Sequence, residues 1–145
     1  MSVILDASLT LAWCSKDEST AHTNAVLEHV ATRGAVVPTL WVYEVANGLV
    51  SGLRRSPPRI QDGDIERFLQ ALSAMPIEVA PAATIATCKS VLKLAAKHSI
   101  SAYDAAYLDL ALQLGLPIGT LDGTGRRHGL KQAAEATGVL LFRPR

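Results

Sequence analysis

The stretch that most constrains this chain is its start, where three branched or bulky apolar residues run directly into a carboxylate in the sequence Ser2-Val3-Ile4-Leu5-Asp6-Ala7-Ser8. A short continuous apolar run is typical of a strand that is buried on both faces, as in the middle of a parallel sheet. Such a strand presents its first polar side chain where it leaves the sheet, and ligands of open α/β folds bind outside the carboxyl ends of the strands. Asp6 is therefore either part of a functional site or the N-cap of the helix that follows.

Short apolar stretches alternate with helical patterns along the whole chain. The predicted strands are 3–5, 35–37, 77–79, 116–121 and 139–142. The predicted helices are 8–16, 21–32, 40–53 (capped by Thr39), 62–75, 81–97 (opened by Pro81), 101–114 and 126–136. Strands that alternate with helices form parallel sheets with helices on both faces, so the sequence predicts an α/β fold, a three-layer α/β/α sandwich with a central parallel sheet. No repeat or linker interrupts this pattern, and we expect one domain over residues 1–145.

The composition indicates a globular protein with a sizeable core. Apolar residues make up 49 % of the 145 residues and charged residues 19 %, which argues against disorder. The apolar runs are short and broken by polar residues, so we expect no membrane span. Met1 leads directly into the first strand, which leaves no room for a signal peptide, and we expect a cytoplasmic protein. Cys14 and Cys88 lack metal-ligand spacing, and we expect both to be reduced thiols in the core.

The net charge of +1 does not indicate nucleic-acid binding. A contact with RNA or DNA would therefore depend on local basic clusters. The chain has two, Arg54-Arg55-Ser56-Pro57-Pro58-Arg59 and Arg126-Arg127-His128 with Lys131. We expect the first to be a solvated loop. Arg126, Arg127 and Lys131 begin the last predicted helix, where they are equally compatible with contacts to an RNA backbone and with a solvated helix face.

Four of the thirteen acids are set in apolar stretches, where an unpaired carboxylate is costly. They are Asp6, Glu44, Asp104 and Asp122. Each has a purely structural interpretation. Asp6 can cap a helix, and Glu44 can be the solvent-facing residue of a buried helix. Asp104 can form a capping box with Ser101, and Asp122 can belong to a simple turn.

The positions of the four acids together favour a common site. Asp6 and Asp122 follow strands at the carboxyl edge of a parallel sheet, and Glu44 lies in the helix that leaves the same edge. Asp104 joins them if the first turn of its helix lies at this rim. Carboxylates at one rim repel one another at neutral pH unless protons or cations neutralise them. Hard oxygen ligands without Cys or His select Mg²⁺ or Mn²⁺, and such ions support phosphodiester hydrolysis by activated water.

Four short motifs containing these acids occur in order along the chain. They are Val3-Ile4-Leu5-Asp6-Ala7-Ser8, Tyr43-Glu44-Val45-Ala46-Asn47, Ser101-Ala102-Tyr103-Asp104-Ala105-Ala106-Tyr107-Leu108 and Thr120-Leu121-Asp122. Each motif is weak alone, but their order, their spacing and the total length are together more specific. The chain resembles a PIN domain, and specifically a VapC-type toxin ribonuclease of a type II toxin–antitoxin system.

This resemblance implies an Mg²⁺-dependent endoribonuclease, with Mn²⁺ as an alternative metal. The implied metal ligands, direct or through water, are Asp6, Glu44, Asp104 and Asp122. The implied supporting hydroxyl and amide groups are those of Ser8, Asn47 and Thr120. The resemblance also implies an RNA substrate, a homodimer, and a small antitoxin whose carboxyl-terminal segment lies across the toxin and often brings an arginine towards the acids.

Other side chains are assigned to the structure and not to the site. Asp109 lies five residues after Asp104, about 140° round the helix, and we expect it to pair with a basic residue or to form a dimer contact. The four histidines are scattered, and we expect them on the surface. We expect Trp13, Trp41 and Tyr103 in the core or in an interface, and not as platforms for base stacking.

Other functions fit the residues less well. A haloacid-dehalogenase-like phosphatase needs a second Asp two residues after its nucleophile, and that position is Ser8 here. A response-regulator receiver needs paired acids after the first strand, but Ala7 follows Asp6. The main alternative is a non-catalytic PIN-like module that binds RNA or a protein partner, although such a module would usually have lost one of the four acids. A DNA-directed or exonucleolytic PIN enzyme is a further alternative, against which the short chain argues.

Overall fold

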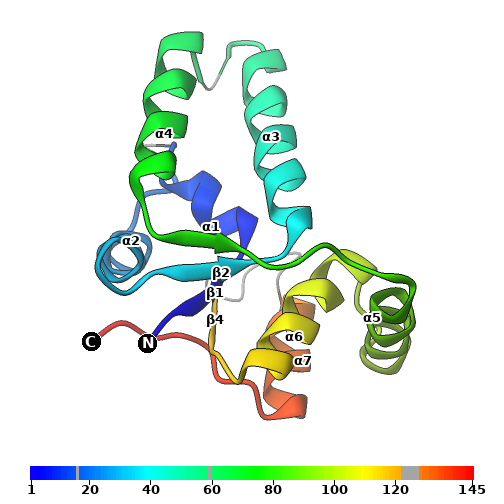
Figure 1. Ribbon diagram of the computed structural model, residues 1–145. Coiled ribbons are helices and arrows are strands. Elements are labelled where there is room, and N and C mark those ends of the chain that lie inside the picture. The colour runs from blue at the N-terminus through cyan, green and yellow to red at the C-terminus, as the bar shows by residue number, and fades with distance from the viewer. Residues whose placement is uncertain (16, 59, 122–127) are drawn as a thin grey trace.

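The computed structural model describes residues 1–15, 17–58, 60–121 and 128–145. Within them the chain forms four strands, β1 (Val3–Leu5), β2 (Ala35–Val37), β3 (Ile77–Val79) and β4 (Ile118–Gly119). The helices of the same residues are α1 (Ala7–Ala12), α2 (Ala21–Arg33), α3 (Thr39–Arg54), α4 (Asp62–Ala74), α5 (Ile85–His98), α6 (Ala102–Leu114) and α7 (His128–Thr137). Strands and helices alternate as the sequence predicts (Figure 1).

The four strands form one parallel sheet with the order β3-β2-β1-β4. In the central strand β1, Ile4 pairs with Val36 of β2 on one side and with Ile118 of β4 on the other. All three residues of β1 are fully buried, as the continuous apolar run predicts. The predicted α/β sandwich with a central parallel sheet is confirmed.

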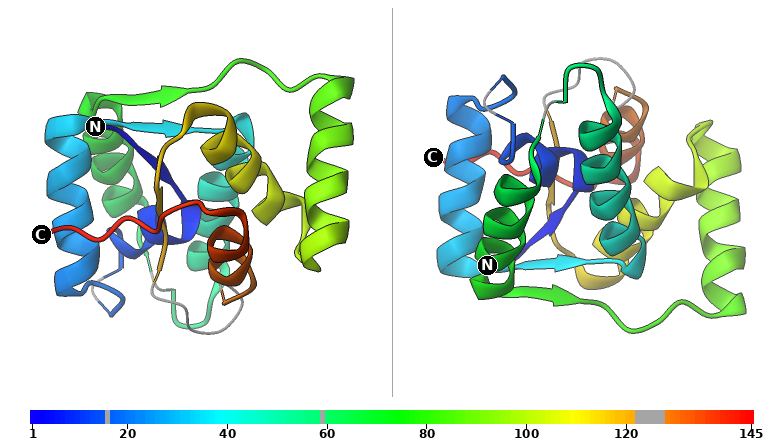
Figure 2. Two further views of the ribbon diagram at one scale, coloured as in Figure 1. Left: turned by 90° about the horizontal axis from the view of Figure 1, so that it is seen from below. Right: turned by 90° about the horizontal axis from the view of Figure 1, so that it is seen from above.

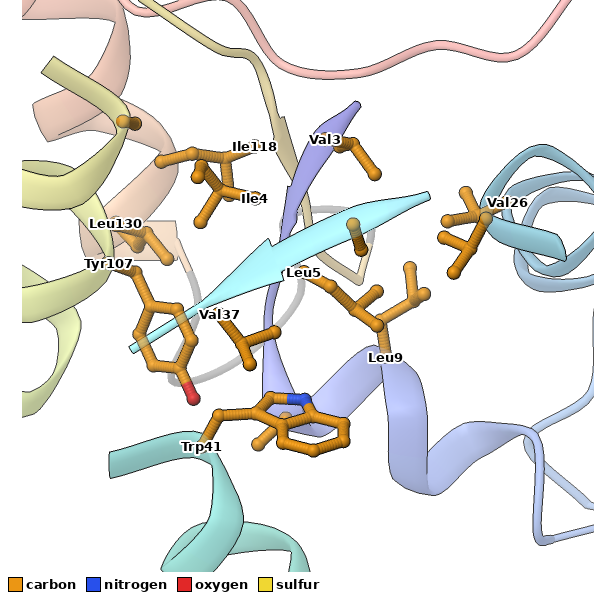
Figure 3. Packing of buried hydrophobic residues seen from close by; sticks show 14 of the residues in the cluster. Val3, Ile4, Leu5, Leu9, Val26, Val37, Trp41, Tyr107, Ile118 and Leu130 are labelled. Atoms are coloured by element: carbon orange, nitrogen blue, oxygen red, sulfur yellow. The ribbon is translucent and has the colours of Figure 1, made fainter. Parts of the chain in front are cut away.

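The two faces of the sheet are covered by different helices, because successive side chains of a strand point to opposite faces. Val3 and Leu5 point towards Val26 of α2, whereas Ile4 points towards the side that carries Tyr107 of α6 (Figure 3). Helices α3 and α4 extend away from the sheet (Figure 1). Helix α5 lies at the outer edge of the molecule next to α6, at the opposite end from α2 (Figure 2).

Most helix bounds agree with the prediction to within one residue, but the end of α1, the cap of α3 and the start of α5 differ from it. α1 ends at Ala12 and not at Lys16, because the Trp13 indole N–H donates to the backbone carbonyl of Thr23 (2.8 Å), which turns the chain towards α2. α3 starts at Thr39 itself, so the prediction of Thr39 as its cap is wrong. The cap position is Pro38, whose side chain makes no capping hydrogen bond.

The start of α5 was also predicted wrongly. The helix begins at Ile85 and not at Pro81, because Thr84 and Thr87 form a reciprocal capping box. The Thr84 backbone N–H donates to the Thr87 hydroxyl (3.1 Å), and the Thr87 N–H donates to the Thr84 hydroxyl (3.4 Å). This local pair outweighs the preference of proline for a first helical turn.

The predicted strand 139–142 is reduced to a single bridge between Leu141 and Ile118. The chain still runs beside β4, since the Ile118 N–H donates to Leu140 (3.0 Å) and the Phe142 N–H donates to Ile118 (2.8 Å). β4 itself spans two residues and not the predicted 116–121. A partner this short cannot support a longer ladder.

The two cysteines differ in their surroundings. Cys14 is half-buried against the core, and burial, together with the charge of Asp64, raises the pKa of its thiol. Cys88 is exposed on α5, so the prediction of a core position is wrong for Cys88, because α5 packs against α6 and leaves its own outer side uncovered. None of the helices in the described part of the chain has both the length and the apolar character needed to cross a bilayer.

Candidate active site

Asp6 lies where the order of the strands reverses. Strands β1 to β3 are added in one direction, and β4 is placed on the other side of β1, so the reversal falls between β1 and β4. Such a point is where open parallel sheets bind ligands. The backbone N–H of Asp6 donates to Gly119 at the end of β4 (3.0 Å), which continues the sheet ladder to this residue. Asp6 is fully buried.

Three donors hold the Asp6 carboxylate. Its Oδ1 accepts a hydrogen bond from the backbone N–H of Ser8 (3.1 Å), which makes Asp6 the N-cap of α1. Its Oδ2 accepts from the hydroxyls of Ser8 (3.0 Å) and Thr120 (2.7 Å). The structural interpretation of Asp6 as a cap is therefore confirmed. The same contacts fix the orientation of a carboxylate at the strand switch point, because hydrogen bonds to an ionised group are short and directional.

Glu44 is placed by the start of α3. The Trp41 indole N–H donates to the Thr10 hydroxyl (3.0 Å), and that hydroxyl donates to the backbone carbonyl of Asp6 (3.1 Å). These two bonds fasten the first turn of α3 to α1. Trp41 is buried, as expected, and Glu44 is half-buried in the next turn.

Tyr107 of α6 holds the Glu44 carboxylate. Its hydroxyl donates to Glu44 Oε1 (2.7 Å), and its side chain is fully buried. Burial, the hydrogen bond to Glu44 and the charges of Glu44 and Asp6 raise the pKa of Tyr107 well above its usual value, which the backbone of Ala7 opposes. Figure 3 shows the hydroxyl pointing away from the core of the sheet towards the start of α3. The Tyr107 hydroxyl therefore joins α6 to Glu44 of α3.

Asp104 lies in the first turn of α6, one turn before Tyr107, and is half-buried. Its backbone N–H donates to the Ser101 hydroxyl (3.0 Å), so Ser101 is a cap, as the structural interpretation supposes. Among the residues that the structure describes, no three His, Cys, Asp or Glu side chains come close enough together to hold a metal ion. Asp122 lies outside these residues, so the site of four acids stays a prediction.

A groove of about 400 Å³ opens beside the acids, and we call it the α1–α3 groove. It is lined by Ala7, Ser8, Leu11, Leu40, Tyr43, Glu44, Asn47, Gly48 and Tyr103. Asn47 is exposed in this groove and lies near Ser8 and Glu44. Tyr103 is 64 % exposed. Tyr103 is therefore not in the core of the chain, and the other expectation for it, an interface, stays a prediction.

Of the basic residues expected near RNA, Lys131 is the one within the described residues. It lines a small cavity together with Thr120 and His22. Arg126 and Arg127 lie outside the described residues. His22 Nε2 is 3.2 Å from the carbonyl oxygen of Thr120. His22, His29 and His98 are half-buried, so they are only partly exposed at the surface, where we expect them.

Asp109 is buried between α5 and α6 and lies away from this site. Its carboxylate accepts hydrogen bonds from the hydroxyl of Ser90 and from Gln113 (2.8 Å). The expectation of a basic partner or a dimer contact is therefore wrong. The position is buried within the chain, and the partners are neutral side chains.

Tyr107 is the site residue that sequence reasoning missed. It lies inside one of the four motifs, but only the acids and the small polar residues of those motifs were assigned roles. The sequence does contain a hint of this contact, because a buried tyrosine hydroxyl needs a hydrogen-bond partner. Glu44, an acid in an apolar helix, needs a hydrogen-bond donor, and the Tyr107 hydroxyl is that donor.

Comparison with known proteins gives the same fold. The family model of the PIN domain matches residues 3–129. The crystal structure of PAE2754 from Pyrobaculum aerophilum is similar, with a TM-score of 0.62 and 25 % sequence identity. That match covers 92 % of this chain and 87 % of the other. No curated protein matches this chain. Since the family model spans most of the sequence, the chain belongs to the PIN domain family.

Proposed function

We propose that this protein is an Mg²⁺-dependent endoribonuclease and the toxin of a VapBC-type toxin–antitoxin pair. PIN domains are generally metal-dependent nucleases. The observation that carries the proposal is the buried Asp6 carboxylate, which the Ser8 and Thr120 hydroxyls hold at the strand switch point. A phosphodiester at the metal site would lie at the end of the α1–α3 groove, since that groove is lined by Glu44 and by Ser8, whose hydroxyl donates to the Asp6 carboxylate.

The donor chemistry of the site fits a hard divalent cation. Asp6 and Glu44 offer carboxylate oxygens, which Mg²⁺ and Mn²⁺ prefer. Asp6, Glu44, Asp104 and Asp122 are the proposed ligands, direct or through water. When bound, the ion polarises a phosphate and lowers the pKa of a bound water.

The side chains around the acids have separate tasks in this proposal. The hydroxyls of Ser8 and Thr120 hold the Asp6 carboxylate, and the Tyr107 hydroxyl holds that of Glu44. Such groups behind a metal ligand fix its orientation. Lys131 offers a positive charge to the RNA backbone, and we assign Arg126 and Arg127 the same role.

The first test is the incubation of purified protein with total cellular RNA in Mg²⁺, in Mn²⁺ and in chelator. We expect discrete, metal-dependent fragments. Asp6→Asn and Asp104→Asn should slow their appearance by more than about 100-fold, since even the groups behind a ligand are worth about 10–100-fold. Asp62→Asn, which changes an exposed acid at the start of α4, is the matched control and should cleave like the parent.

Metal binding is measured separately by calorimetry with Mg²⁺ and Mn²⁺. Unchanged affinity in both Asp6→Asn and Asp104→Asn would refute the proposed metal site. RNA that stays intact under all metal conditions, but crosslinks to the protein, would favour the non-catalytic binding module.

The homodimer and the antitoxin are part of the same proposal. Light scattering on the purified chain should give twice the 15.4 kDa of one chain. Addition of the antitoxin should stop cleavage at one antitoxin segment per site. A monomer that cleaves RNA at full rate would remove the dimer from the proposal.

A further inference from the structure

Two tyrosines occupy equivalent places next to two of the proposed metal ligands. Tyr43 directly precedes Glu44 in α3, and Tyr103 directly precedes Asp104 in α6. Their exposed fractions are 69 % and 64 %, among the highest of the large apolar side chains. Neighbouring residues of a helix point about 100° apart. Each acid can therefore face the sheet edge while the tyrosine before it faces outwards.

Both tyrosines line the α1–α3 groove. The floor of the groove is formed where α1 lies directly against α3. Gly48 makes this contact, because a Cβ at this position would lie only 2.2 Å from Leu11 Cδ1. Glu44 and Ser8 line the same groove, which therefore runs from the two rings to the contacts of the Asp6 carboxylate.

We propose that the α1–α3 groove binds an unpaired nucleobase of RNA next to the cleaved phosphodiester, with the rings of Tyr43 and Tyr103 as its stacking partners. This inference rests on the proposed ribonuclease function. Sequence-specific proteins bind unpaired RNA bases by stacking them on aromatic side chains. Stacking accepts any base, because every base has a π-face. The exposed amide of Asn47, on the same wall of the groove, is placed to hydrogen-bond a base edge.

The charge of the groove favours a base over a phosphate. Among the described residues that line it, none is a lysine or an arginine, and Glu44 contributes a carboxylate. A phosphate would be repelled there in the absence of a metal ion, whereas a nucleobase is neutral and flat. The backbone phosphates are left to the metal site and to the basic side chains beyond Thr120.

The test is the binding of labelled RNA, measured by fluorescence anisotropy. The probes are a single-stranded RNA dodecamer of mixed sequence, the same dodecamer in a duplex, and a dodecamer of base-free ribose phosphates. All proteins carry Asp104→Asn, which keeps the RNA intact. Tyr43→Leu and Tyr103→Leu remove a ring, and Tyr43→Phe and Tyr103→Phe remove only the hydroxyl. Leu92→Ala alters a side chain of α5 that is 66 % exposed, and it is the control.

We expect each leucine variant to bind the single-stranded dodecamer about tenfold more weakly than the parent, the change that about 1.4 kcal/mol of lost stacking produces. The phenylalanine variants and Leu92→Ala should stay within about twofold of the parent. All variants should bind the base-free probe alike, because no base is present to stack. The duplex should bind more weakly than the single strand.

Four results would overturn the inference. One is unchanged affinity of both leucine variants for the single-stranded dodecamer, and another is no binding of it by the parent protein. A third is an equal loss of affinity for the base-free probe, which indicates a backbone contact. The fourth is a change of molecular mass in the leucine variants with RNA binding intact, which indicates an interface between copies of the chain. If the protein with Asp104 intact cleaves no RNA under any metal condition, but the leucine variants still lose affinity for the single strand as expected, the ribonuclease is refuted and the base site stands.

Discussion

Helices α5 and α6 follow one another in the chain and pack together, yet they differ in burial. α5 has 14 residues and none of them is buried. α6 has 13 residues, and the buried ones are Ala105, Tyr107, Leu108, Asp109 and Ala111. The reason is position, because α6 contacts β1 and β4 on one side and α5 on the other. α5 packs mainly against α6.

The difference explains where the site residues lie. Tyr107 and Asp104 belong to the helix that is fixed on two sides, and the preorganised groups of a site need such support. α5 has a different task, since the Ser90 hydroxyl supplies a donor to the buried Asp109 carboxylate. α5 thus covers and completes α6 without taking part in the site.

The largest expected effect is the difference between α6 and α5 in how much a leucine-to-alanine substitution lowers the free energy of unfolding. Leu108→Ala, at a fully buried leucine of α6, should lower the free energy of unfolding by about 2–5 kcal/mol, because it removes apolar contacts and leaves a cavity. Leu92→Ala on α5 should change it by less than about 0.5 kcal/mol, since that side chain is 66 % exposed. Urea unfolding followed by circular dichroism measures both. Similar losses in the two variants would mean that another surface covers α5.

The second effect in size concerns the contact between α5 and α6, in which the Ser90 hydroxyl donates to the Asp109 carboxylate. Ser90→Ala removes a donor from the buried Asp109 carboxylate and should cost about 1–2 kcal/mol in the free energy of unfolding. Ser73→Ala is the matched control, because the Ser73 hydroxyl lies on the exposed side of α4 and donates only to a carbonyl of its own helix. If the two substitutions cost the same, the Ser90 contact contributes nothing to the packing of α5 on α6.

Much of this fold could be predicted, since it follows from local patterns. The run Val3–Leu5 is a buried central strand, as its continuous apolar character indicates. The errors arose where a neighbouring element decides the outcome. The segment 139–142 has the composition of a strand, but the two-residue β4 offers it only Ile118 as a partner. α5 starts at Ile85 and not at Pro81, because Thr84 and Thr87 form a capping box. The preference of proline for a first helical turn does not take such a cap into account.

The candidate site could be predicted in part. Asp6 and its contacts to Ser8 and Thr120 lie at the strand ends, where the parallel topology places polar side chains. The role of Tyr107 depends on a contact with a residue 63 positions away, which no local pattern encodes. The exposure of Tyr103 is set by how α6 packs against its neighbours, which the spacing of residues within the helix does not encode. Spacing shows which residues share an edge, but not which side chains meet across it.

The smallest expected effect at neutral pH is also the sharpest test of the buried face of α6. Tyr107→Phe removes one hydrogen bond to Glu44 and should lower the free energy of unfolding by about 1 kcal/mol at pH 8. Burial, and then the Glu44 contact, raise the pKa of Tyr107 in the folded protein, whereas the unfolded chain titrates near pH 10. Below about pH 10 the hydroxyl is protonated in both states, so its contribution is fully present.

Above about pH 10 the unfolded chain releases a proton that the folded protein retains. This proton release lowers the free energy of unfolding of the parent by about 1.4 kcal/mol per pH unit. Tyr107→Phe has no hydroxyl at this position and therefore no such loss. The stability advantage of the parent over Tyr107→Phe should therefore shrink and reverse between pH 10 and about pH 11. Urea unfolding at half-unit steps measures it, with Tyr43→Phe as an exposed-tyrosine control for the general effect of alkaline pH. A constant difference from pH 8 to about pH 11 would mean that the hydroxyl gives up its proton in the folded protein as readily as in the unfolded chain.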